Sequence, residues 1–362
     1  MSSVLTQNEK SVLYGLVEFP KLTDKELSKK INIKPSTITS IRNRLKRNDY
    51  YRKLIIPRLQ KLGCQLIAAI YTTFNPLIPL DERIEITGKT IEIFEEIFLS
   101  VGEHDKGFSL SLSKDYSTIG KINDIRTQTF GVRGLLEEEY PNIVIFPFEI
   151  SRMYRFLDYG PLLKKNFNIN INTSRNLEDI LNLYSDKINI LTDTGKNVFS
   201  SIISYPEMSD SDIGRELGIS RHTVSLLRRK FENEKLIRYL NLPNLNKLGF
   251  EILAFYHIKF DPSNPPNIKN DEASILLSDS TIFFVTRMFE AVMICIYKNY
   301  EDYRSEMLKI MQLLKENKWI VKEPIIKTFG LNSLVFIKDF KFAPITHKIV
   351  GSDTWIKKLL NM

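Results

Sequence analysis

Six polar side chains recur at helical spacing between Pro35 and Asn48. They are Ser36, Thr39, Ser40, Asn43, Arg44 and Arg47. The apolar residues Ile38, Ile41 and Leu45 stand among them at positions i, i+3 and i+7, so a helix would bury one stripe and expose the other. Hydroxyl, amide and guanidinium groups are those that hydrogen-bond to base edges and phosphates. The segment therefore predicts a helix whose outer face suits contact with nucleic acid.

The elements around this helix predict a winged helix-turn-helix. Apolar spacing indicates three helices, over residues 8–19, 24–31 and 35–48. Thr23 is suited to the N-cap of the second helix, and Glu26 would complete a capping box. The run YYRKLIIP, which ends at Pro57, alternates like a short strand pair and would form the wing. A helix-turn-helix motif commonly places the second helix of its pair, here residues 35–48, in the major groove of DNA.

The same pattern occurs again 186 positions later. Residues 5–76 align without a gap to residues 191–262 and are identical at about 19 of 72 positions. We refer to the two halves of the chain that begin with these segments as copy one and copy two. The best-preserved stretch is PRLQKLG (Pro57–Gly63) against PNLNKLG (Pro243–Gly249). The chain is therefore predicted to be a tandem duplication.

DNA contact is predicted on both copies. The predicted contact residues are Ser36, Thr37, Thr39, Ser40, Asn43, Arg44, Arg47 and Arg52 in copy one, and Arg221, His222, Ser225, Arg229 and Arg238 in copy two. Residues 1–56 hold 12 Lys and Arg against 5 Asp and Glu (+7), whereas residues 191–243 hold 8 against 7 (+1), out of a total of +8. Two alternatives stay open: the face in copy one is an ordinary solvated helix face, or copy two is a structural or protein-contact module.

The segments after each helix-turn-helix read as β-α-β-β-α-β, the ferredoxin-like order. The predicted fold class is α+β, with two copies of a winged helix-turn-helix followed by a ferredoxin-like domain. In copy two the segment NDEASILLS takes the place of the first helix. The predicted domains are a helix-turn-helix (1–57), a ferredoxin-like domain (58–165), a linker (166–190), a second helix-turn-helix (191–243), a second ferredoxin-like domain (244–348) and a tail (349–362).

This layout resembles the Lrp/AsnC (feast/famine) transcription regulators. The most specific marks are LIIPRLQKLG, LNLPNLNKLG and VGEHDKGFSLSL. The resemblance implies a DNA-binding regulator, and it implies that Gly102 and Asp105 border a pocket for a small metabolite such as an amino acid. Both residues are also ordinary turn residues, and copy two has Arg287 and Glu290 instead. Because both copies lie on one chain at high effective concentration, an internal pseudo-dimer is expected, with possible further self-association.

Catalytic and metal chemistry is not indicated by the sequence. The four histidines (His104, His222, His257 and His347) lack metal-ligand spacing, and no phosphate loop or nucleophile elbow occurs. We therefore expect no metal, no cofactor and no enzymatic activity. Two alternatives stay open: a siroheme-decarboxylase-like enzyme on the same fold, with His104, His257 and Arg287 as its thin set of candidates, and an architectural DNA-binding protein of low specificity.

The sequence also predicts a cytoplasmic protein with no membrane partner. It has no run of about 18 apolar residues, and its polar N-terminus is not a secretory signal. Two distant cysteines, Cys64 and Cys295, suggest no disulfide framework.

Overall fold

The computed structural model describes residues 5–137, 140–171 and 188–351. Most of the predicted linker (166–190) and tail (349–362) lies outside these residues. Two compact units make up the chain: unit 1 contains Met1–Leu54, Ser151–Asn182 and Tyr239–Asn332, and unit 2 contains Ile55–Ile150, Leu183–Arg238 and Ser333–Met362. Each unit therefore combines the helix-turn-helix of one copy with the ferredoxin-like domain of the other.

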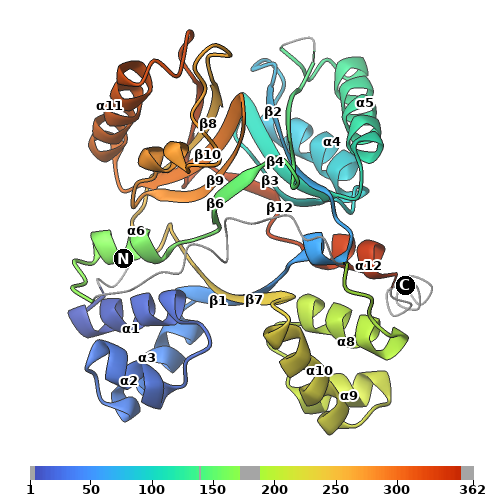
Figure 1. The fold of residues 1–362 in the computed structure, drawn as a ribbon, viewed down its shortest axis with the longest axis vertical. Coiled ribbons are helices and arrows are strands. Elements are labelled where there is room, and N and C mark those ends of the chain that lie inside the picture. Colours follow the sequence, from blue (N-terminus) through green and yellow to red (C-terminus); the bar gives the residue numbers. More distant parts are fainter. Residues whose placement is uncertain (1–4, 138–139, 172–187, 352–362) are drawn as a thin grey trace. The chain divides into compact units, whose positions relative to one another are not determined.

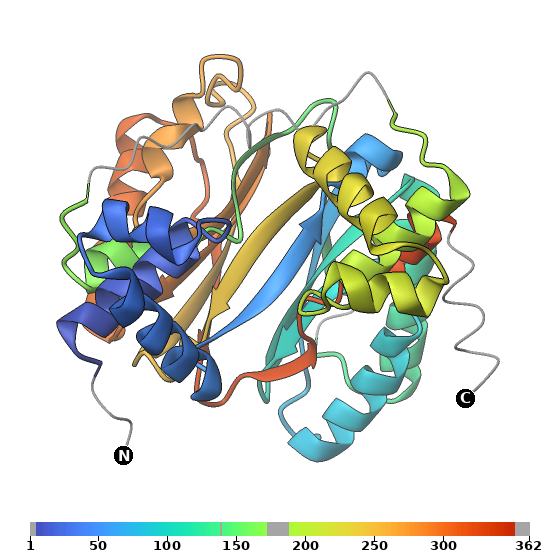
Figure 2. The same cartoon turned by 90° about the horizontal axis from the view of Figure 1, so that it is seen from below.

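A three-helix module opens unit 1 (Figures 1 and 2). Its helices are α1 (Gln7–Glu18), α2 (Asp24–Ile31) and α3 (Pro35–Arg47). The capping box predicted at Thr23 and Glu26 is present at the start of α2. Gly15 lets α1 and α2 approach, because a Cβ there would lie 2.7 Å from a methyl of Leu27. The buried residues of α3 are Ile38, Ile41 and Leu45, as its spacing predicts.

Unit 2 contains the equivalent module from copy two. Its helices are α8 (Asp193–Ser204), α9 (Asp210–Leu217) and α10 (Arg221–Asn233). An ion pair between the second and third helices recurs at the 186-residue offset: Arg42–Asp24 at 2.5 Å and Arg228–Asp210 at 2.7 Å. The repeat detected in the sequence therefore extends to the contacts that fix the angle within each helix pair.

The predicted wing is wrong in its details. Each copy supplies one continuous strand after its third helix, β1 (Tyr51–Pro57) or β7 (Ile237–Pro243), rather than a strand pair. The two strands pair with each other in a two-stranded sheet. No turn residues interrupt YYRKLIIP, so the segment stays extended and finds its partner elsewhere in the chain.

The ferredoxin-like domain of copy one forms the sheet of unit 2, in the antiparallel order β12-β3-β4-β2-β5. Its strands are β2 (Leu66–Thr73), β3 (Ile97–Gly102), β4 (Lys106–Ser113), β5 (Asn142–Pro147) and β12 (Val335–Lys338). Helices α4 (Leu80–Glu92) and α5 (Tyr116–Val132) cover one face of the sheet (Figure 1). The short η1 (Leu59–Leu62) precedes β2.

The ferredoxin-like domain of copy two forms the sheet of unit 1, in the order β11-β8-β10-β9-β6. Its elements are β8 (Ile252–Lys259), η2 (Glu272–Leu276), β9 (Thr281–Arg287), β10 (Glu290–Tyr297), α11 (Tyr300–Glu316), β11 (Ile325–Gly330) and β6 (Arg152–Phe156). The α+β class is confirmed. The full first helix expected at NDEASILLS is wrong, because this segment forms only the five-residue η2.

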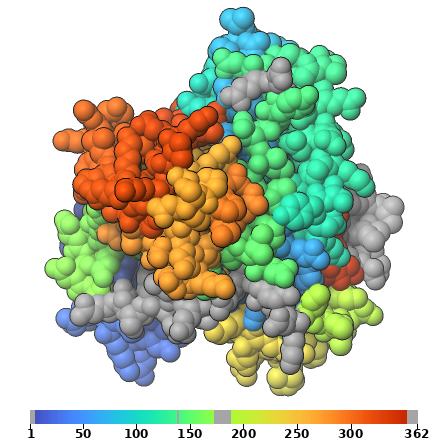
Figure 3. Space-filling model, turned by 45° about the horizontal axis from the view of Figure 1, so that its top comes forward, coloured from blue at the N-terminus to red at the C-terminus, as the bar shows by residue number. Residues whose placement is uncertain are grey.

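Helices α5 and α11, which pack on the two sheets, each expose one side to solvent (Figure 3). Val132 of α5 is 81% exposed and Leu308 of α11 is 54% exposed. The opposite faces of both helices are buried against their sheets, through Ile119 and Ile122 in α5 and Leu314 in α11.

The fifth strand of each sheet comes from the other copy, which the sequence did not reveal. Strand β6 follows β5 in the chain but pairs with β9, and β12 follows β11 but pairs with β3. Each strand leads into a helix of the same unit, α6 (Gly160–Asn166) or α12 (Ala343–Val350). Strand β6 and helix α6 therefore belong to the same unit as the sheet of copy two, whereas the sequence-based domain boundaries placed residues 151–165 with copy one.

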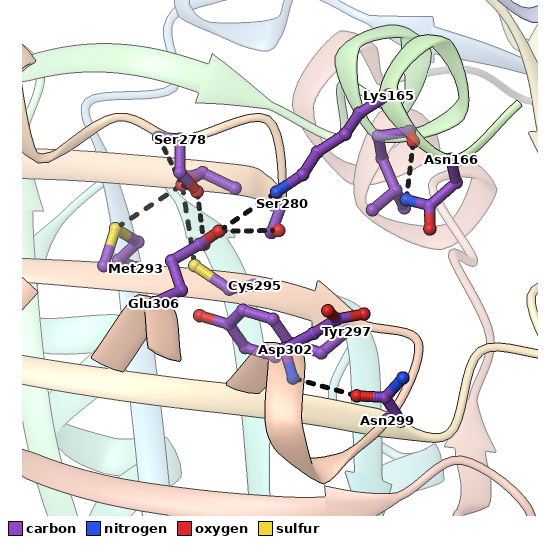
Figure 4. A network of polar contacts seen from close by, with 12 residues as sticks. Lys165, Asn166, Ser278, Ser280, Met293, Cys295, Tyr297, Asn299, Asp302 and Glu306 are labelled. Carbon is purple, nitrogen blue, oxygen red and sulfur yellow. Dashed lines mark hydrogen bonds and ion pairs between the residues drawn. The ribbon is translucent and has the colours of Figure 1, made fainter. Parts of the chain in front are cut away.

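Polar contacts anchor the exchanged segment of unit 1. The guanidinium group of Arg155 donates to the carbonyl oxygens of Ser278 and Thr281, each at 2.6 Å. The Glu306 carboxylate accepts hydrogen bonds from the hydroxyls of Ser278 and Ser280 and lies 3.6 Å from Lys165 Nζ (Figure 4). These contacts tie β6 and α6 to the loop before β9 and to α11.

We expect Arg155→Ala to lower the free energy of unfolding by about 2–3 kcal/mol, because two carbonyl groups would lose their donor. Urea unfolding of the full chain measures the change. Lys298→Ala removes one charge from an exposed turn and should alter stability by less than about 0.5 kcal/mol. Equal stability of the two variants would contradict the anchoring role of Arg155.

Candidate nucleic-acid interface and effector hairpin

Helix α3 exposes the polar stripe predicted from the sequence. Ser36, Thr39, Ser40, Asn43, Arg44 and Arg47 are exposed, while Thr37 is half-buried. The three-helix module holds this stripe in place, because α1 and α2 pack against the buried side of α3. The face thus presents hydroxyl, amide and guanidinium groups on one rigid element.

Contacts within the module already fix two of these side chains. The Thr39 hydroxyl donates to Asp24 at 2.5 Å, and Arg44 forms an ion pair of 2.7 Å with Glu9. Burial raises the pKa of Glu9, but hydrogen bonds from Thr6 and the charge of Arg44 more than offset it, so the net pKa is lowered. Arg44 is therefore held against an ionised carboxylate.

Three of the other four exposed side chains are available for contact with another molecule. Within the described residues, no side-chain hydrogen bond or ion pair holds Ser40, Asn43 or Arg47. A hydroxyl, an amide and a guanidinium group at i, i+3 and i+7 can together reach the base edges and a flanking phosphate of one strand.

Helix α10 has a different outer face. Arg221, His222 and Arg229 are exposed, Ser225 is half-buried, and Leu226 is 51% exposed among them. Lys230 lies 3.8 Å from Glu234, at the end of the same helix. The face keeps basic groups at both ends but has an apolar centre, so it is less suited than α3 to hydrogen bonding with bases.

The two arginines predicted on the wings lie on the paired strands instead. Arg52 is exposed on β1, and Arg238 is half-buried on β7. Both positions follow the third helix of their module by the same number of residues. They lie on strands in a sheet and not at the tips of hairpins.

The hairpin between β3 and β4 contains the two predicted effector residues. Gly102 is buried, and the side chain of Asp105 is 50% exposed. The guanidinium group of Arg83, from α4, packs against Gly102: a Cβ added there would lie 3.3 Å from Arg83 Nη1. Arg83 also donates to the Glu103 carbonyl oxygen and lies 4.5 Å from the centroid of the Phe74 ring. Gly102 therefore provides room for a buried arginine.

Sequence reasoning missed Arg83, because it lies in the highly charged run DERIEITGK. Its spacing was the available signal: Arg83, Thr87, Thr90 and Ile91 stand at i, i+4, i+7 and i+8, and all are buried. Burial lowers the pKa of Arg83 to about 10, with the charge of Asp105 acting in the opposite direction. At neutral pH the guanidinium group stays charged.

The corresponding hairpin of copy two is closed by an ion pair. Arg287 bonds to Glu290, whose other oxygen lies 3.5 Å from Nε2 of the buried His257. The hydrogen bond from His257 and the contacts with Arg287 lower the pKa of Glu290 to about 2. These charges neutralise one another.

The remaining histidines do not form a metal site. His104 and His222 are exposed, and the buried His347 on α12 has its Nε2 3.1 Å from the Ser204 hydroxyl of α8. No group of three or more His, Cys, Asp or Glu residues within 5–137, 140–171 and 188–351 is arranged to hold a metal ion. In the same residues, no helix is both long and apolar enough to cross a membrane.

No family model matches this sequence, and no curated protein sequence matches it. Among solved structures, the siroheme decarboxylase NirDL matches with a TM-score of 0.50 and 9% identity, covering 95% of this chain and 98% of that one. NirDL in complex with an iron-uroporphyrin III analogue matches with a TM-score of 0.50 and 10% identity, covering 96% and 99%. These two matches establish the fold over nearly the whole chain.

A transcriptional regulatory protein of the AsnC family from Pyrococcus furiosus also matches, with 21% identity and a TM-score of 0.31, over 40% of this chain and 90% of that one. The expectation that this chain is not an enzyme is contradicted by the full-length matches, since both are structures of a decarboxylase. The exclusion failed because it rested on missing motifs, and a fold of this type can carry chemistry without them.

We expect His347 to make stability depend on pH. Burial lowers its folded-state pKa to about 4, below the usual value of about 6.5, so the unfolded chain binds a proton first as the pH falls. Stability is therefore full above pH 6.5 and declines as the pH falls through 4, by an amount of order 3 kcal/mol.

Urea unfolding at pH 7.0, 5.5 and 4.5 measures this change. A His347→Asn variant should lose that part of the slope, while His104→Asn, which changes an exposed histidine, should keep it. Identical slopes for wild type and His347→Asn would contradict the assignment.

Proposed function

We propose that this protein is a sequence-specific DNA-binding transcription regulator whose principal reading element is α3. The observation that carries the proposal is the exposed stripe of Ser40, Asn43 and Arg47 on a helix whose opposite side is buried through Ile38, Ile41 and Leu45. The +7 charge of residues 1–56 supports it, because phosphate neutralisation supplies much of the affinity of DNA-binding proteins. Thr39 and Arg44, held by Asp24 and Glu9, would contact the phosphate backbone next to the bases that are read.

Copy two would add further contacts to DNA. Arg221, His222, Ser225 and Arg229 would add backbone contacts, and the exposed Leu226 can contact a thymine methyl group. Since the two faces differ in chemistry, the two half-sites that they bind would differ in sequence. We further propose that a small metabolite acts through the hairpin of Gly102 and Asp105, and that the chain self-associates.

We expect Arg44→Ala combined with Arg47→Ala to weaken DNA binding and to reduce the slope of log K against log salt concentration by about 1–2, because each lost phosphate contact contributes roughly 0.9. Fragments selected from sheared genomic DNA, measured by fluorescence anisotropy from 50 to 200 mM salt, provide the test.

Lys298→Ala with Arg304→Ala is the matched control, since it removes two exposed charges from the start of α11 and the turn before it. An unchanged slope in the α3 variant would refute the proposed role of α3. Tight binding without sequence enrichment would favour an architectural DNA-binding protein instead.

A second candidate function rests on the full-length fold match. The chain would act on an acidic tetrapyrrole, as its structural neighbour NirDL is a siroheme decarboxylase. Buried guanidinium groups such as that of Arg83 are suited to bind carboxylates. Against this candidate, His257 and Arg287 are already bound to Glu290, and His104 lies exposed in the hairpin turn.

For this second candidate we expect addition of an iron-uroporphyrin III analogue to shift its Soret band at a 1:1 ratio. Release of carbon dioxide from siroheme under anaerobic conditions would be the corresponding activity. A spectrum identical to that of the free compound, at protein concentrations of about 50 μM, would exclude binding tighter than about 0.1 mM and contradict this function.

A further inference from the structure

Two arginines are buried between the sheet of unit 2 and the helices that cover it. Arg83 of α4 is 1% exposed and Arg126 of α5 is 3% exposed. Within the described residues, no ion pair joins either guanidinium group to a carboxylate. A buried charge without a partner costs several kcal/mol, and arginine cannot avoid the cost by losing its proton.

Several donors of these arginines have no hydrogen-bond partner. Arg126 donates from Nη1 to the Ser109 hydroxyl at 2.8 Å, but its Nε is buried and unpaired. Arg83 donates to the Glu103 carbonyl oxygen, while its Nε and Nη1 are buried and unpaired. The hydroxyls of Ser111 and Thr72 are also buried without a partner. Most of these unpaired groups can donate, so an acceptor would satisfy them.

Aromatic rings connect the two arginines. Arg83 lies 4.5 Å from the centroid of Phe74, Arg126 lies 5.7 Å from that of Phe130, and the two rings contact edge to face at 5.9 Å. The guanidinium groups therefore belong to one cluster under α4 and α5, and each comes from a different helix. A ligand that binds both needs two acidic groups.

Copy two shows that the fold does not require this polarity. In copy one, Ser109, Ser111 and Ser113 of β4 pair with Ile70, Ala68 and Leu66 of β2. The residues of β8 at the 186-residue offset are Tyr256, Ala254 and Ile252, and their partners on β10 are Met293, Cys295 and Tyr297. Three small hydroxyl residues in copy one therefore correspond to three larger, mostly apolar ones in copy two.

The helix position of Arg126 can also be compared with its equivalent in copy two. Helices α5 and α11 each have 17 residues and a similarly placed N-cap, Asp115 or Asn299. Arg126 is the eleventh residue of α5, and the eleventh residue of α11 is Ile310, which is buried in an apolar core. The fold therefore accepts an apolar residue at the eleventh position of this helix. Packing alone does not explain why copy one has Arg126 there.

We propose that the polar cluster of Arg83, Arg126, Ser109 and Ser111 is a binding site for a small organic dianion such as a dicarboxylate. Each guanidinium group would bind one acidic group of the ligand, and the serine hydroxyls of β4 would donate hydrogen bonds to the acidic group held by Arg126. Arg83 also packs against Gly102, so a ligand that moves Arg83 would also change the packing of the β3–β4 hairpin. This inference gives a chemistry to the proposed metabolite and does not depend on DNA binding, because its test uses no DNA.

The test is the melting temperature of the full chain with succinate, glutarate or adipate, against acetate and chloride at equal ionic strength. We expect at least one dicarboxylate to raise the melting temperature by about 3 °C or more at about ten times its Kd, and acetate to have no such effect. Isothermal titration calorimetry would give the Kd and a 1:1 ratio. No shift with any of the three dicarboxylates, or an equal shift with acetate, would overturn the proposal.

Arg126→Ile reproduces the residue of copy two and should abolish the dicarboxylate shift without lowering the melting temperature of the ligand-free protein. Arg133→Ile removes the same charge from an exposed position at the end of α5 and should keep the full shift. Arg83→Gln provides a second test if Arg126→Ile does not fold. A full dicarboxylate shift in Arg126→Ile or in Arg83→Gln would overturn the proposal.

Discussion

Backbone pairing with a strand from the other copy completes both sheets of this protein. Without β6, strand β9 would be an edge with unpaired amide and carbonyl groups, and without β12 the same would hold for β3. Side chains reinforce the pairing: Arg155 donates to the carbonyls of Ser278 and Thr281, and Lys338 donates to that of Phe94. Because each unit needs segments from both halves of the chain, the two copies cannot be separated without opening both sheets.

This dependence leaves the copies free to differ elsewhere. The contacts that define the helix pairs are kept, as the matched ion pairs Arg42–Asp24 and Arg228–Asp210 show. The outer faces have changed, since Ser40 of α3 corresponds to Leu226 of α10. Interaction with another molecule, rather than folding, constrains an outer face, so divergence there is compatible with the same packing inside each module.

The two ferredoxin-like domains have diverged in a second way, in their cores. Copy two packs Tyr256, Met293 and Cys295 beneath α11, and its one buried carboxylate there, Glu306, is satisfied by serine hydroxyls (Figure 4). Copy one instead keeps small hydroxyl residues on the sheet and places Arg126 against them. A core that carries unpaired charge gives up stability, which is the usual signature of a functional position.

The sequence alone determined the fold class and the boundaries of most helices, and it predicted the tandem repeat. Local chemistry was sufficient for the helices: the capping box at Thr23 and the stripe of Ile38, Ile41 and Leu45 act within a few turns of chain. The exposed groups of α3 were also predictable, because helical periodicity decides which side chains face outward.

Only the tertiary structure decided which segments pair and which charged side chains are buried. Strands β6 and β12 read like any short extended segment, and the choice of partner depends on which sheet edge is open, a property of the assembled fold. Arg83 and Arg126 read as surface residues of charged helices, because sequence patterns assume that charge is solvated. Helical spacing places Arg83 on the buried side of α4, but the room for a guanidinium group there comes from the packing of α4 and α5 on a sheet face made of small residues.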